Sequence, residues 1–157
     1  MIIIDTREPK GLRFALSTTL EREKVPFAEA PLPCGDYKLY PRAGVCVLIE
    51  RKEQKDLSSS IIDGRLSVQI DRLVSFQDGD DTKVTVVLLV EGPPFPRQGT
   101  GWKPTATKRA PGVHPNSLRG ALLSIQQRGL FVLYSKEAVD TIQSILWLYR
   151  RFQREEK

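Results

Sequence analysis

The sequence has little of the chemistry that builds zinc centres or disulfide scaffolds. It contains two cysteines, Cys34 and Cys46, and one histidine, His114. A structural zinc site needs four protein ligands and a catalytic one needs three with a water molecule, so this set does not make a zinc centre. We expect both cysteines to be free, packed thiols. A disulfide is the alternative, because the two residues flank one predicted hairpin.

Long apolar runs are missing as well. The longest, residues 84–90, has strand length and falls short of the roughly 18 residues that a membrane-spanning helix requires. The N-terminus has no basic segment followed by a long apolar stretch, which argues against a signal peptide. We therefore expect an intracellular protein with no membrane partner. Its 157 residues predict a single domain over residues 1–157.

Acidic residues are absent from residues 92–136, in a chain whose net charge is +5. The stretch therefore holds cations with no acidic residue among them: Arg97, Lys103, Lys108, Arg109, Arg119, Arg128 and Lys136. A polyanion is the natural partner of such a surface, and a solvated, charge-biased loop is the alternative.

Residues 92–113 form a proline- and glycine-rich segment, which is longer than an ordinary connection and therefore predicts a functional loop. Trp102 lies there among Lys103, Lys108 and Arg109. We expect these four residues to contact DNA, with the indole stacked on an unpaired base. Packing of Trp102 against the body of the domain is the alternative.

Apolar periodicity predicts a mixture of strands and helices. The predicted strands are residues 2–4, 27–32, 37–40, 45–51, 84–90 and 130–134, and the predicted helices are residues 10–24, 53–62, 65–76, 115–128 and 136–155. The last two strands are nearly all apolar, as expected of strands buried on both faces. His114, the single histidine, precedes Pro115 at a helix start, which indicates a capping or packing role; a general base is the alternative. We predict an α/β fold in which helices cover a mixed central β-sheet.

Two predicted neighbouring strands carry a pattern of acids and a lysine. Alternation along a strand places Glu50 and Lys52 on one face, and the hairpin turn places Asp36 opposite Ile49 or Glu50. Carboxylates so close repel each other unless a cation lies between them, and Mg²⁺ or Mn²⁺ suits oxygen ligands. Such an ion would polarise a phosphodiester and lower the pKa of a bound water.

Other residues would assist this chemistry. Lys52 would hold the attacking water or offset charge on the phosphate. Asp5, at the end of the first predicted strand, would supply a further carboxylate, and Arg7 or Arg51 would hold phosphate. The alternative is a surface hairpin with ordinary pairing of charges two residues apart, since an Asp followed by Glu-x-Lys is a weak motif in isolation.

The surrounding residues make the pattern specific. Gly35-Asp36-Tyr37 is followed by Glu50-Arg51-Lys52 with Asp56 four residues later, and then by Ser60-Ile61-Ile62-Asp63-Gly64-Arg65, Gln69 and Arg72-Leu73. Ile4-Asp5-Thr6-Arg7-Glu8 and His114-Pro115-Asn116-Ser117-Leu118-Arg119-Gly120-Ala121 match as well. Over nearly its whole length the chain resembles the XPF-type structure-specific endonucleases, above all the nuclease domains of archaeal helicase-associated endonucleases.

This resemblance implies a restriction-endonuclease-like fold and a metal-dependent endonuclease that cuts branched DNA, such as flaps and forks, in repair, replication or recombination. It implies metal ligation by Asp36 and Glu50 with Asp5 close by, and Lys52 as the catalytic lysine. The residues that it implies support the site or grip DNA are Arg51, Asp56, Arg7, Arg65 and Gln69.

The chain departs from these relatives in two respects. It contains neither the helix-hairpin-helix repeats nor the helicase that accompany such domains, and its loop over residues 92–113 is longer. One alternative function is a non-catalytic DNA-binding or scaffold subunit, since the family that the chain resembles contains partners that have lost the motif. The other is a duplex nuclease without branch preference. The presence of Asp36, Glu50, Arg51, Lys52 and Asp56 favours catalysis.

The last predicted helix is apolar over much of its circumference. One face carries Ala138, Ile142, Ile145, Tyr149 and Phe152, and its sides carry Val139, Leu146, Trp147 and Leu148. With the helix over residues 115–128, it is expected to form a two-fold homodimer interface, which the resemblance also implies. A core helix within the monomer is the alternative.

Overall fold

Six strands form one sheet in the part of the chain that the computed structural model describes, residues 1–92 and 114–154. They are β1 (Ile2–Asp5), β2 (Phe27–Ala30), β3 (Tyr37–Arg42), β4 (Val45–Glu53), β5 (Lys83–Glu91) and β6 (Phe131–Ser135), in the spatial order β2-β1-β3-β4-β5-β6. The β1–β3 and β3–β4 pairs are antiparallel, whereas β1–β2, β4–β5 and β5–β6 are parallel. The predicted mixed sheet is confirmed.

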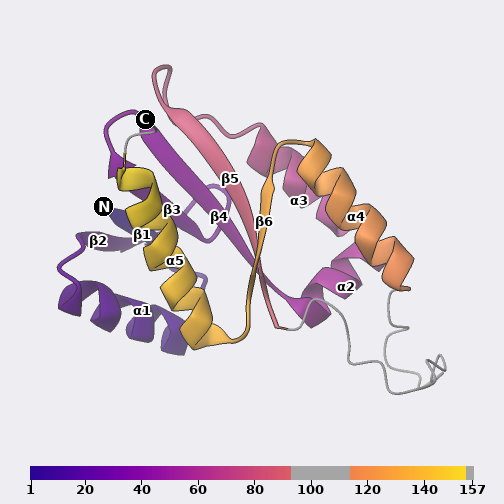
Figure 1. Cartoon of the computed structure of the whole chain (residues 1–157), viewed down its shortest axis with the longest axis horizontal. Helices are drawn as coiled ribbons and strands as arrows, with labels where there is room; N and C mark the ends of the chain where they lie inside the picture. Colours follow the sequence, from indigo (N-terminus) through magenta and orange to yellow (C-terminus); the bar gives the residue numbers. More distant parts are fainter. Residues whose placement is uncertain (93–113, 155–157) are drawn as a thin grey trace.

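Helices cover both faces of this sheet (Figure 1). They are α1 (Lys10–Arg22), α2 (Gln54–Ile62), α3 (Arg65–Val74), α4 (Pro115–Gln127) and α5 (Ala138–Gln153). Helices α1 and α5 pack on one face in a core that includes Leu16, Ile49 and Ile145, and α2, α3 and α4 pack on the other in a core that includes Leu48, Ile70 and Leu122. Leu48 and Ile49 are neighbours in β4, so that strand contributes to both cores.

The β3–β4 hairpin sets the position of the acidic residues. Arg42 pairs with Val45 across a two-residue turn, but further along Tyr37 pairs with Ile49, so β3 carries one extra residue between Leu39 and Arg42. Pro41 lies in this bulge, where its missing N–H costs no ladder hydrogen bond. Continued by one residue, the register places Asp36 opposite Glu50, the second of the two positions that the sequence allowed.

Each predicted element is present, and most boundaries agree within two residues. His114 caps α4, since its Nδ1 accepts a hydrogen bond of 3.1 Å from the Asn116 N–H. The cysteines are free thiols, as expected. Among the described residues, no helix is both long and apolar enough to cross a bilayer.

The predicted burial of the last strand was wrong. Strand β6 is an edge strand, not a strand buried on both faces, and its residue Phe131 is 60% exposed. Helix α5 buries Ile142, Leu146 and Tyr149 against its own sheet and leaves only part of its apolar circumference, including Trp147, in solvent. A run of apolar residues does not show which strand lies at the edge of a sheet. A helix that packs on a sheet can bury apolar residues on more than one side.

Candidate active site

The two faces of β4 separate the predicted catalytic residues. Val47 and Ile49 belong to the core under α1 and α5, and Leu48 belongs to the core under α2, α3 and α4. Because side chains alternate along a strand, Glu50 and Lys52 lie on the face of α2 and α3. The Nζ atom of Lys52 lies 3.7 Å from Oε1 of Glu50. The side chain of Arg51 points to the opposite face.

Backbone hydrogen bonds hold Asp36 at the start of β3. Its N–H donates to the Ile49 carbonyl at 2.8 Å, and its carbonyl accepts from the Asp5 N–H at 2.9 Å. Its carboxylate accepts a hydrogen bond of 2.7 Å from the Arg51 N–H to Oδ2. The Asp36 carboxylate is thereby tied to the main chain of the strand that carries Glu50.

Gly35 allows the close approach that this arrangement needs. Its φ is +69°, and a Cβ atom there would lie 2.7 Å from Cδ1 of Leu48 and 3.1 Å from the Ile49 carbonyl oxygen. A positive φ already disfavours other residues, and the contact with backbone leaves little room for relaxation.

We expect Gly35→Ala to lower the free energy of unfolding by about 2–4 kcal/mol, through backbone strain and overpacking. Gly64→Ala is the matched control, because Gly64 has a φ of +70° but no atom of the described ranges lies within 4 Å of the added Cβ. The control should lose only about 1 kcal/mol. Chemical denaturation measures both, and equal losses would show that the contact with Leu48 and Ile49 does not matter.

A cavity of about 280 Å³ opens over this part of the sheet. It is lined by Arg7, Pro33, Cys34, Gly35, Asp36, Glu50, Gln69, Arg72 and Leu73. Four elements or loops that are distant in sequence therefore meet here: the loop after β1, the start of β3, the end of β4, and α3. The cavity combines two carboxylates with two arginines, which suits an anionic substrate that is handled through a cation.

The charges of Asp36 and Glu50 disturb each other. Burial, then the nearby Glu50 and Glu8 carboxylates, raise the pKa of Asp36 to about 7, although the Arg51 N–H opposes the shift. Burial also raises the pKa of Glu50, and Lys52 lowers it in part. A site in which both carboxylates are ionised at neutral pH is therefore short of positive charge.

Asp5 is fully occupied by other partners. Arg7 donates from Nε to Oδ1 at 2.9 Å and from Nη2 to Oδ2 at 2.6 Å. The N–H groups of Arg7 and Leu32 donate to the same two oxygens at 2.7 and 2.8 Å. The hydrogen bond from Arg7 is the main cause that lowers the pKa of Asp5 to about 2. In this arrangement Asp5 holds Arg7 at the edge of the cavity, and its part as a metal ligand stays a prediction.

Gln69 contributes an unpaired acceptor. Its Oε1 atom is buried and has no hydrogen-bond partner among the described residues, although the residue lines the same cavity as Asp36 and Glu50. A buried acceptor without a donor costs roughly 1–3 kcal/mol, so such an atom indicates a donor that belongs to a bound group or water.

A divalent ion fits this donor set. No group of three or more His, Cys, Asp or Glu side chains in the described ranges is arranged to hold a metal, so the site depends on the Asp36 and Glu50 pair. Mg²⁺ commonly binds through one or two carboxylates and keeps several waters. Burial and the Glu50 carboxylate raise the pKa of Asp36, a shift that a bound cation would oppose, and Oε1 of Gln69 would accept a hydrogen bond from a water held in the cavity.

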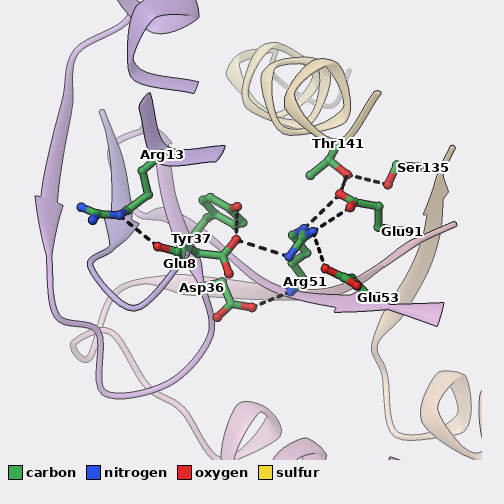
Figure 2. Close-up of polar contacts among 9 residues, drawn as sticks. All are labelled: Glu8, Arg13, Asp36, Tyr37, Arg51, Glu53, Glu91, Ser135 and Thr141. Carbon is green, nitrogen blue, oxygen red and sulfur yellow. Dashed lines mark hydrogen bonds and ion pairs between the residues drawn. The ribbon is translucent and has the colours of Figure 1, made fainter. Parts of the chain in front are cut away.

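The side chain of Arg51 is buried in a second polar cluster on the face of α1 and α5 (Figure 2). It forms two hydrogen bonds to Glu91, of 3.0 Å from Nε and 2.6 Å from Nη2, and a longer one of 3.4 Å to Glu53. Glu8 lies 4.0 Å from Nη1 and accepts a hydrogen bond from the Tyr37 hydroxyl. Arg51 therefore supports the site and does not line the cavity.

Sequence reasoning gave no roles to Glu8, Tyr37, Glu91 and Thr141. They come from separate parts of the chain and share no spacing with Arg51. One signal was available for Glu91, because a charged residue that ends an otherwise apolar strand needs a partner.

Two other predicted residues lie outside this arrangement. Asp56 lies exposed in the first turn of α2 and Arg65 lies exposed at the start of α3, where it pairs with Asp63 at 2.8 Å. Neither lines the cavity. Trp102, Lys103, Lys108 and Arg109 lie outside the described residues, so their contact with DNA stays a prediction.

Comparison with known proteins agrees with this geometry. A family model described as the ERCC4 domain matches residues 4–148. The chain belongs to the ERCC4 domain family. The ERCC4 fold recurs in the structure of XPF from Aeropyrum pernix, at 28% identity and a TM-score of 0.70 over 98% of this chain and 65% of that one. The structure of that protein in complex with DNA gives 28% identity and a TM-score of 0.68 over 99% of this chain and 67% of that one. The restriction-endonuclease-like fold and the XPF-type nuclease domain are thereby confirmed.

Two curated relatives share the ERCC4 domain. A protein of Methanocaldococcus jannaschii that bears the name of an ATP-dependent RNA helicase is 32% identical over 127 residues, which are 80% of this chain and 13% of that protein. An ERCC4 domain-containing protein of African swine fever virus is 26% identical over 164 residues, which are 98% of this chain and 42% of that protein. The chain thus spans less than half the length of these relatives.

Proposed function

We propose that this ERCC4 domain is a metal-dependent DNA endonuclease that hydrolyses phosphodiester bonds, with a preference for branched DNA in repair, replication or recombination inside the cell. The observation that carries the proposal is the pairing of Asp36 with Glu50, beside Lys52, in a cavity that also presents arginines. The DNA complex of the XPF protein from Aeropyrum pernix supports DNA as the substrate.

The chemistry follows from these side chains. Asp36 and Glu50 would hold Mg²⁺ or Mn²⁺, which when bound supplies a Lewis acid for the phosphoryl oxygen and lowers the pKa of a coordinated water. Lys52 orients the attacking water or offsets the negative charge that grows on the phosphate. Arg7 and Arg72 lie on the rim of the same cavity and bind phosphates of the strand.

The test is cleavage of labelled flap, fork, nicked and plain duplex DNA, with Mg²⁺ or with a chelator. Faster cleavage of flap or fork than of duplex, abolished by the chelator, is the expected result. Equal rates on all substrates would leave a duplex nuclease without branch preference. Binding to DNA without cleavage would establish the alternative, a non-catalytic DNA-binding or scaffold subunit.

Metal affinity should depend on pH. Ligands must be deprotonated to bind a metal, so a carboxyl whose pKa is raised to about 7 competes with protons near neutrality. As the pH increases toward 7, the affinity for Mn²⁺ should rise by about tenfold per pH unit for each proton displaced. Above pH 7 the affinity should become constant. Calorimetric titration over this range measures the effect, and a constant affinity would contradict the shifted pKa of Asp36.

The same shift reverses the usual effect of pH on the stability of the metal-free protein. The folded state keeps a proton on Asp36 between the ordinary pKa of about 3.9 and about 7, whereas the unfolded state has lost it. The free energy of unfolding should therefore fall as pH rises through this window. Asp36→Asn should remove that part of the slope, and an unchanged slope in this variant would assign it to other groups.

The proposal includes a homodimer through the C-terminal helices and the edge strand between them. Helices α4 and α5 lie on opposite faces of the sheet, on either side of β6 (Figure 1). Large apolar side chains are exposed on all three elements: Leu123, Phe131, Tyr134, Val139 and Trp147. Exposed apolar side chains on three neighbouring elements favour a contact with another chain, and in the described part of the chain the outer edge of β6 is unpaired and offers free backbone groups.

Trp147→Glu should convert the dimer to a monomer. Trp147 is 56% exposed, so the substitution places a charge at the interface and leaves the core unchanged. Phe14→Glu is the matched control, because Phe14 is 74% exposed on α1, away from β6. Sedimentation equilibrium should show twice 17.7 kDa for the unmodified chain and the control. A single species near 17.7 kDa for the unmodified chain would refute the dimer.

A further inference from the structure

A chain of partly buried polar contacts connects α5 with the proposed metal site, although the two lie on opposite faces of the sheet (Figure 2). The Oγ1 atom of Thr141 in α5 donates to Oε2 of Glu91 at 2.6 Å. Glu91 ends β5 and accepts two hydrogen bonds from Arg51 in β4. The N–H of Arg51 then donates to Oδ2 of Asp36 at 2.7 Å.

The direction of these hydrogen bonds is determined by chemistry. Two donors act on Glu91, and although burial opposes its ionisation, they hold its pKa below the usual value. An ionised carboxylate only accepts, so the single hydroxyl proton of Thr141 must point to Glu91. The contact of 2.7 Å between the hydroxyls of Ser135 and Thr141 is then donated by Ser135. Both hydroxyl residues are buried, with 2% and 0% exposure.

The Arg51 side chain is held tightly as a result. Its guanidinium lies among the carboxylates of Glu8, Glu53 and Glu91, and the charged bidentate pair with Glu91 has the shortest contacts. Successive side chains of a strand leave opposite faces, so an Arg51 side chain held on one face determines how the peptide group of Arg51 is turned. That peptide carries the N–H that binds Asp36, and it joins Arg51 directly to Glu50.

We propose that Glu91 and Thr141 are positioning residues for the Asp36–Glu50 pair, and that they act through Arg51 from the face of the sheet opposite the cavity. This inference rests on the proposed function for its catalytic consequence. Within the described part of the chain, the Arg51 N–H is the one hydrogen-bond donor to the Asp36 carboxylate. If the Arg51 side chain is held less firmly, its N–H no longer fixes the Asp36 carboxylate relative to the Glu50 carboxylate. The pair then binds the metal more weakly.

Three variants test the relay in the full chain. Thr141→Val keeps the shape of the side chain and removes the hydroxyl, and Thr141→Ser is the matched control that keeps the hydroxyl. Glu91→Gln keeps the shape and removes the charge that binds Arg51. If Glu91→Gln does not fold, the comparison of Thr141→Val with Thr141→Ser tests the proposal by itself.

The first measurement does not require activity. Hydrogen exchange of the Arg51 amide, followed by NMR, should become about tenfold faster in Glu91→Gln and several-fold faster in Thr141→Val, whereas Thr141→Ser should stay within about twofold of the unmodified chain. The amides of Val47 and Leu88 in the sheet core serve as an internal reference. Faster exchange at these as well would show a general loss of stability and would overturn the proposal, as would an unchanged Arg51 amide.

The second measurement is single-turnover cleavage with saturating DNA and Mg²⁺. Glu91→Gln should lower the rate about tenfold and leave the dissociation constant for DNA within about twofold, because the relay acts on geometry and not on phosphate contacts. A normal rate in both Glu91→Gln and Thr141→Val would overturn the relay. If the unmodified chain does not cleave, the proposed nuclease function fails, and the exchange of the Arg51 amide still decides the relay.

Discussion

Asp36→Asn and Glu50→Gln should each abolish metal-dependent cleavage, with a loss of three or more orders of magnitude in single-turnover rate. Each removes one of two carboxylates that are proposed to hold the ion, and a metal supplies several kcal/mol of stabilisation to the transition state. Since about 1.4 kcal/mol corresponds to a tenfold change in rate, the expected loss follows directly. The affinity for Mn²⁺, measured by calorimetry, should fall in parallel.

DNA binding and folding should survive in these variants. Affinity for DNA comes from cations, whereas removal of a carboxylate from the pair relieves repulsion within a site where burial and Glu50 raise the pKa of Asp36. We expect both variants to be at least as stable as the unmodified chain without metal. Asp81→Asn is the matched control, because Asp81 is an exposed carboxylate outside the cavity. Cleavage at the normal rate by either active-site variant in Mg²⁺ would refute the metal assignment.

Much of the fold could be predicted because the spacing of apolar residues along the chain determines the individual helices and strands. The spacing of Leu12, Leu16 and Leu20 predicts α1, and all three side chains are buried. Gly64 separates α2 from α3 with a positive φ, as the Asp63-Gly64 break indicated. The edge position of β6 depends on the order of strands in space, and the local pattern of Leu130, Val132 and Leu133 does not contain that order.

The site was predictable where its members share a hairpin. Asp36, Glu50 and Lys52 are brought together by local pairing, so strand alternation and one turn suffice to place them. Strand alternation also places Arg51 on the other face, yet its motif neighbours suggested a part in catalysis. Its actual partners, Glu8 and Glu91, lie 43 and 40 residues away in sequence and meet it only after β1, β4 and β5 have formed one sheet.

The tertiary contacts give Asp5 partners that the sequence did not indicate. From the sequence it is a third carboxylate near the metal, but the structure gives both its oxygens to Arg7 and to the Leu32 N–H. The four donors already offset the charge of this buried carboxylate. Asp5 thereby holds the positive charge of Arg7 at the cavity rim, and its part as a metal ligand stays a prediction.

Lys52→Ala should reduce the single-turnover rate by about two to four orders of magnitude, the range for one electrostatic or proton-handling group. The side chain of Lys52 is 9% exposed and its Nζ lies 3.7 Å from Glu50, so water screens its charge only weakly. There it offsets charge that develops on the phosphate, and this interaction is stronger in the transition state than in the bound substrate. The dissociation constant for DNA should therefore change little.

Lys55→Ala is the matched control for the loss of one positive charge. Lys55 lies three residues later, but its side chain is 76% exposed and pairs with Glu53 at 3.0 Å. Water screens a charge in that position, so its removal should change the rate by less than about threefold. Equal losses in both variants would show that net charge, and not the placement of Lys52 beside Glu50, assists cleavage. A weaker dissociation constant with an unchanged rate in Lys52→Ala would instead assign Lys52 to DNA binding, because a group that acts in the transition state lowers the rate with saturating DNA.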